Sequence, residues 1–406
     1  MRNQKKDLAS PRPTRVSAPR RRIKHIAKEV LPEKASIQPA GGISVFIMSA
    51  IVLQLILLFL HFMIYETILA AFGIGGVVPE VILGILSLTF ISSSLLSAMA
   101  QNAVVRAYYR LSALWFSFVA PLCAACAGFV IIENLFPLWG WVLTPFMAGV
   151  VCFGAAIAVS LYGIANSFYL RVKRITVSLP NIPATWRGKR LVFFSDVHLG
   201  DVRGAGFSRK IVKKVQAQDP LVVAIAGDMF DGVKCDAEKA IAPFKDLRPP
   251  QGIYFASGNH EYIRDHEMFF DAIRSAGITI LRDEKVDVGG VSLIGVDWKD
   301  ARKREDFSAI LERMDLPKGR PSILVKHVPD NLDVAESAGI SLQLSGHTHR
   351  GQFWPLSIIT YFSYKGFAYG LHYFKKMAVY TSSGTGTWMS PFRFGTASEI
   401  VVVEFK

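Results

Sequence analysis

The chain has 406 residues, of which 51% are hydrophobic and 19% charged, and its formal net charge is +14. A mean hydropathy of +0.32 is too high for an ordinary soluble enzyme and excludes that class. The excess is concentrated, because the segment from residue 42 to residue 170 holds only two basic and three acidic residues. We therefore divide the chain into three parts, residues 1–42, 43–170 and 171–406.

The first part, residues 1–42, is a basic tail. It holds eleven Lys and Arg residues against three acidic ones, and it cannot bury a hydrophobic core. We expect it to be disordered and cytoplasmic. Two roles stay open: it can lie on anionic lipid headgroups, at about 1 kcal/mol per basic residue, or it can simply enforce the topology. No aromatic residues interleave the charge, so no nucleic acid partner is expected.

The second part, residues 43–170, predicts an α-helical membrane domain of about four spans. A helix needs about 20 apolar residues to cross a bilayer. The candidate segments are Ile43–Tyr65, Val81–Ala100, Leu111–Phe136 and Trp139–Tyr169. Serines at 92–94 dilute the second segment, and Pro121 and Pro145 are expected to kink the third and fourth. No segment shows the polar face that a soluble helical core requires.

Basic residues predict the orientation of these spans. They occur in the tail, at Arg106 and Arg110, and at Arg171–Arg174, whereas the connections at 66–80 and 136–140 hold none. Short basic connections stay in the cytoplasm. Both termini and the C-terminal part are therefore predicted to face the cytoplasm of a bacterial inner or plasma membrane. If the second segment does not span, the C-terminal part faces outward.

The third part, residues 171–406, alternates short apolar runs with polar clusters. Each run, such as Leu191–Phe194, is typical of a buried strand. The clusters are Asp196–His198, Gly227–Asp231, Gly258–Glu261, Lys326–Val328 and Gly346–His349. In open α/β sheets, sites lie where the carboxyl ends of strands meet. Five clusters far apart in the chain are therefore expected to form one site.

The side chains of these clusters are carboxylates, imidazoles and one amide. Mixed oxygen and nitrogen ligands favour divalent metals such as Mn, Fe or Zn. Seven candidate ligands are too many for one tetrahedral ion, and they suit two ions that share a bridging carboxylate. No cysteine lies in a cluster, so a thiolate zinc site is not indicated. Five of the nine histidines lie in the clusters, which argues against ordinary core histidines.

The ordered set Asp-x-His, Gly-Asp-x-x-Asp, Gly-Asn-His-Glu, His and Gly-His-x-His resembles the calcineurin-like metallophosphoesterase superfamily, from about residue 175 to the end. Ser195–Gly200 and Ser345–Gln352 are most similar to its membrane-associated bacterial branch. The resemblance implies a four-layer α/β sandwich, with two mixed sheets between outer helices. It also implies hydrolysis of a phosphoester or pyrophosphate bond by a metal-activated hydroxide.

The resemblance further implies a role for each site residue. The implied metal ligands are Asp196, His198 and His349 for one ion, Asn259, His327 and His347 for the other, and Asp228 as the bridge. His260 is the implied catalytic acid, and Asp231 the residue that hydrogen-bonds it and fixes its tautomer. Glu261 is expected to be structural. Arg350 stands where the branch usually has glycine, and both a bidentate phosphate contact and a solvent-facing side chain stay open.

Three hypotheses for the function stay open. The first is a lipid-linked phosphoester or pyrophosphate, held near the bilayer by the membrane part. The second is a soluble, nucleotide-type phosphodiester. The third is a membrane sensor or scaffold with a regulated phosphoesterase output. The aromatic stretch from Phe353 to Tyr380 is compatible with docking at the bilayer interface, with an acyl-chain groove, or with ordinary packing. No oligomeric state is indicated.

Overall fold

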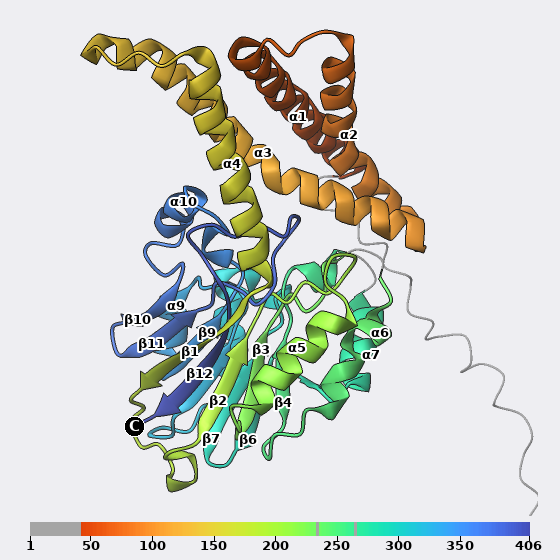
Figure 1. The fold of residues 1–406 in the computed structure, drawn as a ribbon. Helices are drawn as coiled ribbons and strands as arrows, with labels where there is room; N and C mark the ends of the chain where they lie inside the picture. Colours follow the sequence, from red (N-terminus) through yellow and green to blue (C-terminus); the bar gives the residue numbers. More distant parts are fainter. Residues whose placement is uncertain (1–41, 233–234, 264–265) are drawn as a thin grey trace, which may run out of the picture.

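The computed structural model describes residues 42–232, 235–263 and 266–406. The basic tail lies outside these residues, so its predicted disorder stays a prediction. The described chain has two regions, a group of long helices and a region built on two β-sheets (Figure 1). The helical region passes directly into the sheet region, because the last long helix ends at Phe168 and the first strand begins at Leu170.

Four long apolar helices precede the sheets. They are α1 Gly42–Phe72, α2 Val77–Met99, α3 Ala103–Leu135 and α4 Pro145–Phe168. All four are long and apolar enough to cross a membrane, which confirms the four predicted segments. The serines of α2 do not break it, because their hydroxyls donate to carbonyls of their own helix: Ser92 to Leu88 and Ser94 to Phe90, both at 2.7 Å.

The prediction for the fourth segment was wrong at its start. A short 3-10 turn at Phe136–Trp139 follows α3, and α4 begins only at Pro145. Proline does not kink this helix because it occupies the first turn, where its missing N–H is not needed. Thr144 caps the same end by accepting a hydrogen bond from the Met147 N–H at 3.3 Å. Pro121 does lie inside α3, as expected.

The sheet region contains two six-stranded mixed sheets that face each other. In spatial order, the first sheet is β1 Leu170–Val177, β12 Ser398–Phe405, β2 Arg190–Phe194, β3 Val222–Ala226, β4 Ile253–Ala256 and β5 Thr279–Ile280. The second is β10 Gly370–Phe374, β11 Met377–Thr381, β9 Leu342–Ser345, β8 Ser322–Val325, β7 Val291–Gly295 and β6 Glu284–Val288. Strands β2, β3 and β4 pair in parallel, as do β7, β8 and β9.

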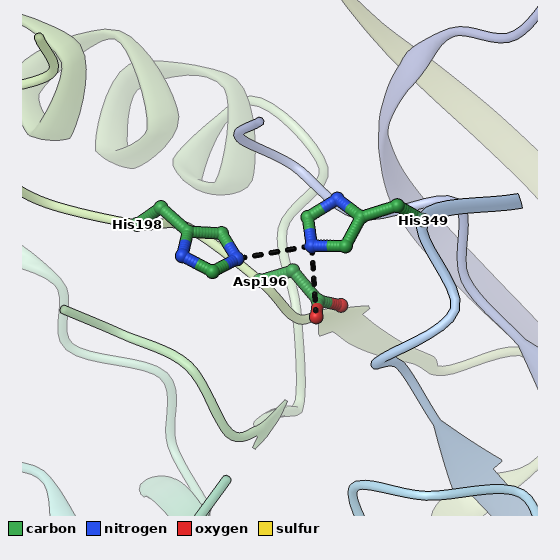
Figure 2. A group of neighbouring side chains, drawn as sticks. All are labelled: Asp196, His198 and His349. Carbon is green, nitrogen blue, oxygen red and sulfur yellow. Dashed lines mark hydrogen bonds and ion pairs between the residues drawn. The ribbon is translucent and has the colours of Figure 1, made fainter. Parts of the chain in front are cut away.

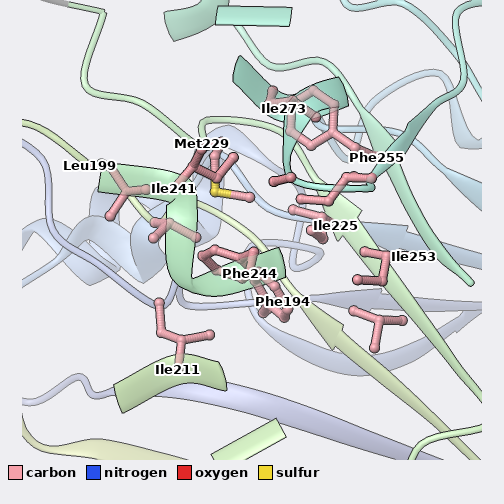
Figure 3. Close-up of a cluster of buried hydrophobic side chains, with 14 of the residues drawn as sticks. Phe194, Leu199, Ile211, Ile225, Met229, Ile241, Phe244, Ile253, Phe255 and Ile273 are labelled. Atoms are coloured by element: carbon pink, nitrogen blue, oxygen red, sulfur yellow. The ribbon is translucent and has the colours of Figure 1, made fainter. Parts of the chain in front are cut away.

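Helices cover the outer face of each sheet. The first sheet carries α5 Ala205–Gln216, α6 Ala237–Ile241 and α7 His266–Ser275, and the second carries α8 Arg304–Arg313 and α9 Leu332–Ser337. Figure 3 shows the first outer core, where Phe194 and Ile225 of the sheet meet Ile211 of α5 and Phe244. Alternate residues of β2, Leu191 and Phe193, point into the core between the sheets. The predicted four-layer α/β sandwich is confirmed.

The helical region contacts the sheet region next to the loops that follow its strands. Near the end of α2, the Ser97 hydroxyl donates to the Asp201 carboxylate, and the Arg110 guanidinium of α3 donates to the Asp201 carbonyl at 2.5 Å. Near the end of α4, the Asn166 amide donates to the carbonyls of Arg393 and Thr396, both at 2.9 Å. These contacts join three long helices to the two loops around residues 201 and 393.

Candidate metal centre

The five polar clusters converge at one edge of the sandwich. Asp196 and Asp228 follow β2 and β3, and the cluster at 258–261 follows β4 in the same sheet. His327 follows β8, and the cluster at 346–349 follows β9 in the facing sheet. Because β2, β3 and β4 run parallel to one another, and β8 and β9 likewise, their carboxyl ends bring these loops together.

Asp196, His198 and His349 form the first group of candidate ligands (Figure 2). The Nε2 atoms of the two histidines lie 3.0 Å apart, and His349 Nε2 lies 3.6 Å from Asp196 Oδ1. All three residues are buried. The Asp196 carboxylate is held in place by the Ser195 hydroxyl and by the His347 N–H, which donates to it at 2.9 Å.

Asp228, Asn259, His327 and His347 form the second group. His327 Nε2 lies at its centre, 3.2 Å from Asp228 Oδ2, 3.1 Å from Asn259 Oδ1 and 3.2 Å from His347 Nδ1. The other nitrogen of His327 faces the Ala226 carbonyl at 2.8 Å, and this bond orients the ring. Asp228 connects the groups, because its Oδ2 also lies 3.9 Å from His198 Nε2.

The backbone at these positions is unusual. Asp196, His198, Asp228, His347 and His349 all have positive φ, between 48° and 70°. The left-handed region is unfavourable for residues other than glycine, and such conformations persist where surrounding structure imposes them. Here the tight turns direct each side chain from its strand end toward the same point.

The chemistry of this donor set fits metal ions. Burial, with His327 nearby, lowers the pKa of His347 to about 3, and burial, with His198 nearby, holds the pKa of His349 well below its usual value. Both rings are therefore neutral and present a lone pair. Imidazole nitrogens and carboxylate oxygens that face one another across 3.0–3.6 Å suit a shared cation.

The structure places His260 and Asp231 beside the first group, with a contact that differs from the expected one. His260 Nδ1 donates to the backbone carbonyl of Asp231 at 3.0 Å, whereas the Asp231 carboxylate lies 4.0 Å away. That carboxylate instead contacts His198 Nδ1 at 3.2 Å. Burial lowers the pKa of His260, but the carboxylates of Asp228 and Asp231 outweigh burial and raise it. The carbonyl therefore orients His260, and the carboxylate orients His198.

Glu261 holds two of the ligand loops together. Its fully buried carboxylate accepts hydrogen bonds from the backbone N–H groups of Asp228 at 2.9 Å, Met229 at 2.8 Å and Gly258 at 2.8 Å. A carboxylate that accepts several N–H groups fixes their positions strongly. Burial, with Asp228 nearby, raises the pKa of Glu261 to about 7. Glu261 therefore has the structural role expected for it, because it holds the loops after β3 and β4 in place.

Arg393 is a residue that the sequence reasoning missed. It is fully buried, and its guanidinium donates to the carbonyls of Ser383 at 2.6 Å and Gly386 at 2.7 Å, and to that of His349 at 3.4 Å. Burial lowers its pKa to about 10. Arg393 thus supports the loop behind His349 from the connection between β11 and β12, 44 positions along the chain. No local motif marked it, since one arginine after Pro391 and Phe392 carries no signal by itself.

Arg350 adopts neither orientation considered from the sequence. Its backbone is left-handed, with φ 52° and ψ 33°, which is the conformation that glycine favours. Its guanidinium lies over the Tyr369 ring, 4.4 Å from the centroid. The arginine therefore accepts the backbone geometry of a glycine position, and its side chain stacks on an aromatic ring.

A cavity of about 560 Å³ opens above the candidate ligands. Asp228, Asn259 and His260 form its polar floor. The apolar part of its lining comes from three places: Phe116 of α3, the residues Leu356 and Ile359 of helix α10 Leu356–Ser363, and Trp388 with Met389. Polar side chains, among them Gln352 and Thr360, complete the lining. The Trp388 ring meets His260 edge to face, at 6.0 Å between centroids. A membrane-region helix therefore contributes directly to the space over the site.

Comparisons with known proteins agree with this architecture. Residues 189–351 match the family model described as calcineurin-like phosphoesterase. An uncharacterized metallophosphoesterase of Helicobacter pylori is 33% identical over 215 residues, which cover 52% of this chain and 58% of that protein. An uncharacterized metallophosphoesterase of Campylobacter jejuni is 31% identical over 239 residues, covering 58% and 63%.

A similar relative also occurs in an animal. A transmembrane protein with metallophosphoesterase domain from Danio rerio is 32% identical over 265 residues, which cover 61% of this chain and 60% of that protein. The chain thus spans about three fifths of the length of these relatives. Because both bacterial and animal proteins match, the comparisons do not single out the bacterial branch.

Proposed function

We propose that this chain, whose residues 189–351 match the calcineurin-like phosphoesterase family model, is a membrane-anchored, two-metal hydrolase of a lipid-linked phosphoester or pyrophosphate. The observation that supports a lipid-linked substrate is the cavity over the candidate ligands. Its lining combines the candidate ligands with a large apolar part, to which Phe116 of a predicted membrane span contributes. A phosphate with an apolar substituent matches this division.

We assign the metal ligands as the two groups described above. Asp196, His198 and His349 would hold one ion, Asn259, His327 and His347 the other, and Asp228 would bridge them. When bound, two such ions polarise the phosphoryl oxygens and activate a water for in-line attack. Donor chemistry is compatible with Mn, Fe or Zn, and availability would decide between them.

The protein's own residues supply orientation and a proton. The backbone N–H of His260 donates a hydrogen bond to Asp228 Oδ1 at 2.9 Å, which leaves Asp228 Oδ2 directed toward His327. Since His260 Nδ1 donates to the Asp231 carbonyl, its Nε2 is the nitrogen that can protonate the leaving oxygen. Asp231 orients His198, and Trp388 restricts His260 from the cavity side. Each residue therefore has a distinct task.

The arrangement in the membrane is part of the proposal. Residues 43–170 would form the membrane domain and residues 171–406 the catalytic domain, with the basic tail at 1–42 preceding both. Four spans would put both termini on one side, and the basic flanks favour the cytoplasmic side of the inner or plasma membrane of a bacterium.

Regulation through the membrane region is a second candidate, favoured by one contact. Ser97 of α2 and Arg110 of α3 both bind Asp201, three residues after His198. A movement of either helix would reach the loop that carries a candidate ligand. A soluble phosphodiester substrate has no such observation in its favour, and the experiment below includes it as an outcome.

The test is phosphodiesterase activity of the full chain purified in detergent. We would assay bis-(para-nitrophenyl) phosphate with Mn²⁺ and with chelator, and measure metal content in the same samples. We expect metal-dependent turnover that Asp228→Asn abolishes, and about two ions per chain that fall with this substitution. Equal turnover by wild type and Asp228→Asn would contradict the proposed centre. Faster turnover of soluble nucleotide diesters than of micellar lipid would favour the soluble substrate.

A further inference from the structure

Two cavities meet at Phe353. One is the cavity over the candidate ligands, and the other is an apolar groove of about 380 Å³ between α3, α4 and the sheet region. Phe353 lines both, and its ring packs against Phe392 at 5.5 Å between centroids. The candidate active site is therefore adjacent to a groove among the helices that are long and apolar enough to span a membrane.

One face of α3 runs through both cavities. Phe116 lines the site cavity, and Ala120 and Ala124 line the groove. Residues four apart lie on the same side of an α-helix, so these three positions form a continuous track. The two alanines leave open the space that a larger side chain occupies one turn earlier, at Phe116.

Helix α4 and the sheet region form the other walls of the groove. On α4 the lining residues are Val151, Cys152, Ala155, Ala156 and Val159, which again share one face. Trp354 and Phe394 close the end toward the sheet region. No residue that lines the groove is charged, so the groove offers nothing to a phosphate and suits a hydrocarbon chain.

Helix α10 adds an apolar surface at the rim of the site. All eight of its residues lie outside the core, and Leu356, Ile359 and Phe362 are 40%, 62% and 72% exposed. Such a surface is typical of an element that lies in the membrane interface. Because Leu356 and Ile359 line the site cavity together with Phe116, apolar residues of both α3 and α10 border the site.

We propose that the groove between α3 and α4 binds the hydrocarbon chain of a membrane-resident phosphoester whose phosphate lies over the candidate metal ligands. This proposal rests on the proposed hydrolase function and extends it to the lipid tail. A lipid chain is the occupant that the structure favours, because the groove lies between two predicted membrane spans and shares the lining residue Phe353 with the site cavity. One molecule would place its phosphate in the site cavity and its chain in the adjacent groove.

The first test compares two diesters that differ only in chain length, hexadecyl and methyl para-nitrophenyl phosphate. In both, the water oxygen bonds to phosphorus, and the bond to the nitrophenolate oxygen breaks. We expect the full chain in detergent to prefer the hexadecyl diester by about tenfold in kcat/KM. Ala155→Phe, which fills the groove, should remove this preference by lowering turnover of the hexadecyl diester.

Ala158→Phe is the matched control, because Ala158 is exposed on the same helix and does not line the groove. It should retain the preference for the long chain. The inference is overturned if wild type shows no chain-length preference, or if Ala155→Phe and Ala158→Phe behave alike.

The second test does not depend on turnover. Hexadecyl phosphate with a diazirine at the chain end is photolysed with the full chain, and labelled peptides are identified by mass spectrometry. We expect labelling of the α3 and α4 residues that line the groove, suppressed by unlabelled hexadecyl phosphate and not by methyl phosphate. Labelling spread evenly over the exposed faces of α1 and α2 would overturn the inference.

The two tests separate the two proposals. Specific labelling in the groove without hydrolysis of either diester would leave the chain site standing and refute the hydrolase function. Hydrolysis without a preference for the long chain and without specific labelling would support the hydrolase function and refute the chain site.

Discussion

The hydroxyl of Ser97, near the end of α2, donates a hydrogen bond to the buried carboxylate of Asp201. Asp201 follows the candidate ligand His198 by three residues, and the Arg110 guanidinium of α3 binds its carbonyl at 2.5 Å. A buried carboxylate is costly unless it is hydrogen-bonded. This contact therefore ties the position of a site loop to the packing of two helices of the membrane region.

Removing the Ser97 hydroxyl should weaken this connection. Ser97→Ala leaves the Asp201 carboxylate with an unmet hydrogen bond, which typically costs about 1–3 kcal/mol in the free energy of unfolding. We expect a lower melting temperature in detergent and reduced diesterase activity. Ser94→Ala removes a hydroxyl that bonds only within α2 and should change neither property. Equal behaviour of the two variants would show that the contact does not support the site.

Glu261→Gln should loosen the two ligand loops while keeping the side-chain size. Both oxygens of the carboxylate accept hydrogen bonds from backbone N–H groups, whereas the amide of glutamine offers only one acceptor oxygen. Because groups that support metal ligands typically contribute 10–100-fold in affinity, we expect Mn²⁺ to bind about tenfold more weakly or worse. Binding is measured by metal titration followed by thermal shift. Glu238→Gln, at an exposed position of α6, should leave the affinity unchanged. Unaltered metal affinity in Glu261→Gln would refute this role.

Arg393→Lys should damage the first candidate metal group although the charge is kept. A lysine ammonium cannot reproduce the planar fork that bonds the carbonyls of Ser383, Gly386 and His349 together. Each buried carbonyl left unpaired costs about 1–3 kcal/mol. We expect a lower melting temperature and loss of about one metal ion per chain by elemental analysis. The matched control is Arg209→Lys on the exposed face of α5. Full metal content in a folded Arg393→Lys protein would argue that His349 does not depend on this support.

The predicted topology can be checked with cysteines in a background without the four native ones. Trp141→Cys lies in the exposed connection before α4, and Lys376→Cys lies on the exposed surface of the catalytic part. If all four helices span and the basic flanks are cytoplasmic, a membrane-impermeant maleimide labels only the first in intact cells. Both should react after lysis. The reverse pattern would place the catalytic part outside the cytoplasm.

Much of this architecture could be predicted from sequence. Apolar length alone identified the four long helices, because a bilayer requires a long uninterrupted apolar helix. The predicted start of the fourth helix was wrong, because a proline inside an apolar run can either kink a helix or begin one. Here Pro145 begins α4, and Thr144 caps that end. Buried runs that end in polar residues predicted the strands. The four-layer sandwich was implied by the resemblance of the ordered clusters to the calcineurin-like superfamily.

The order of the clusters along the chain marked the residues that now lie together at the site. It could not show that the Asp231 carboxylate faces His198 while its carbonyl faces His260, because both contacts are within reach of one residue and packing selects between them. The same holds for Arg393, which acts on His349 across 44 positions and belongs to no motif.

The sequence by itself determined which segments are apolar enough for the membrane and which side chains can bind metal, because both depend on residue type and local period. Only the tertiary structure decided that Phe116 of a membrane helix lines the same cavity as His260, and that this cavity adjoins the groove between α3 and α4. That relation depends on how two separately patterned regions pack against each other, and no local pattern of residues encodes it.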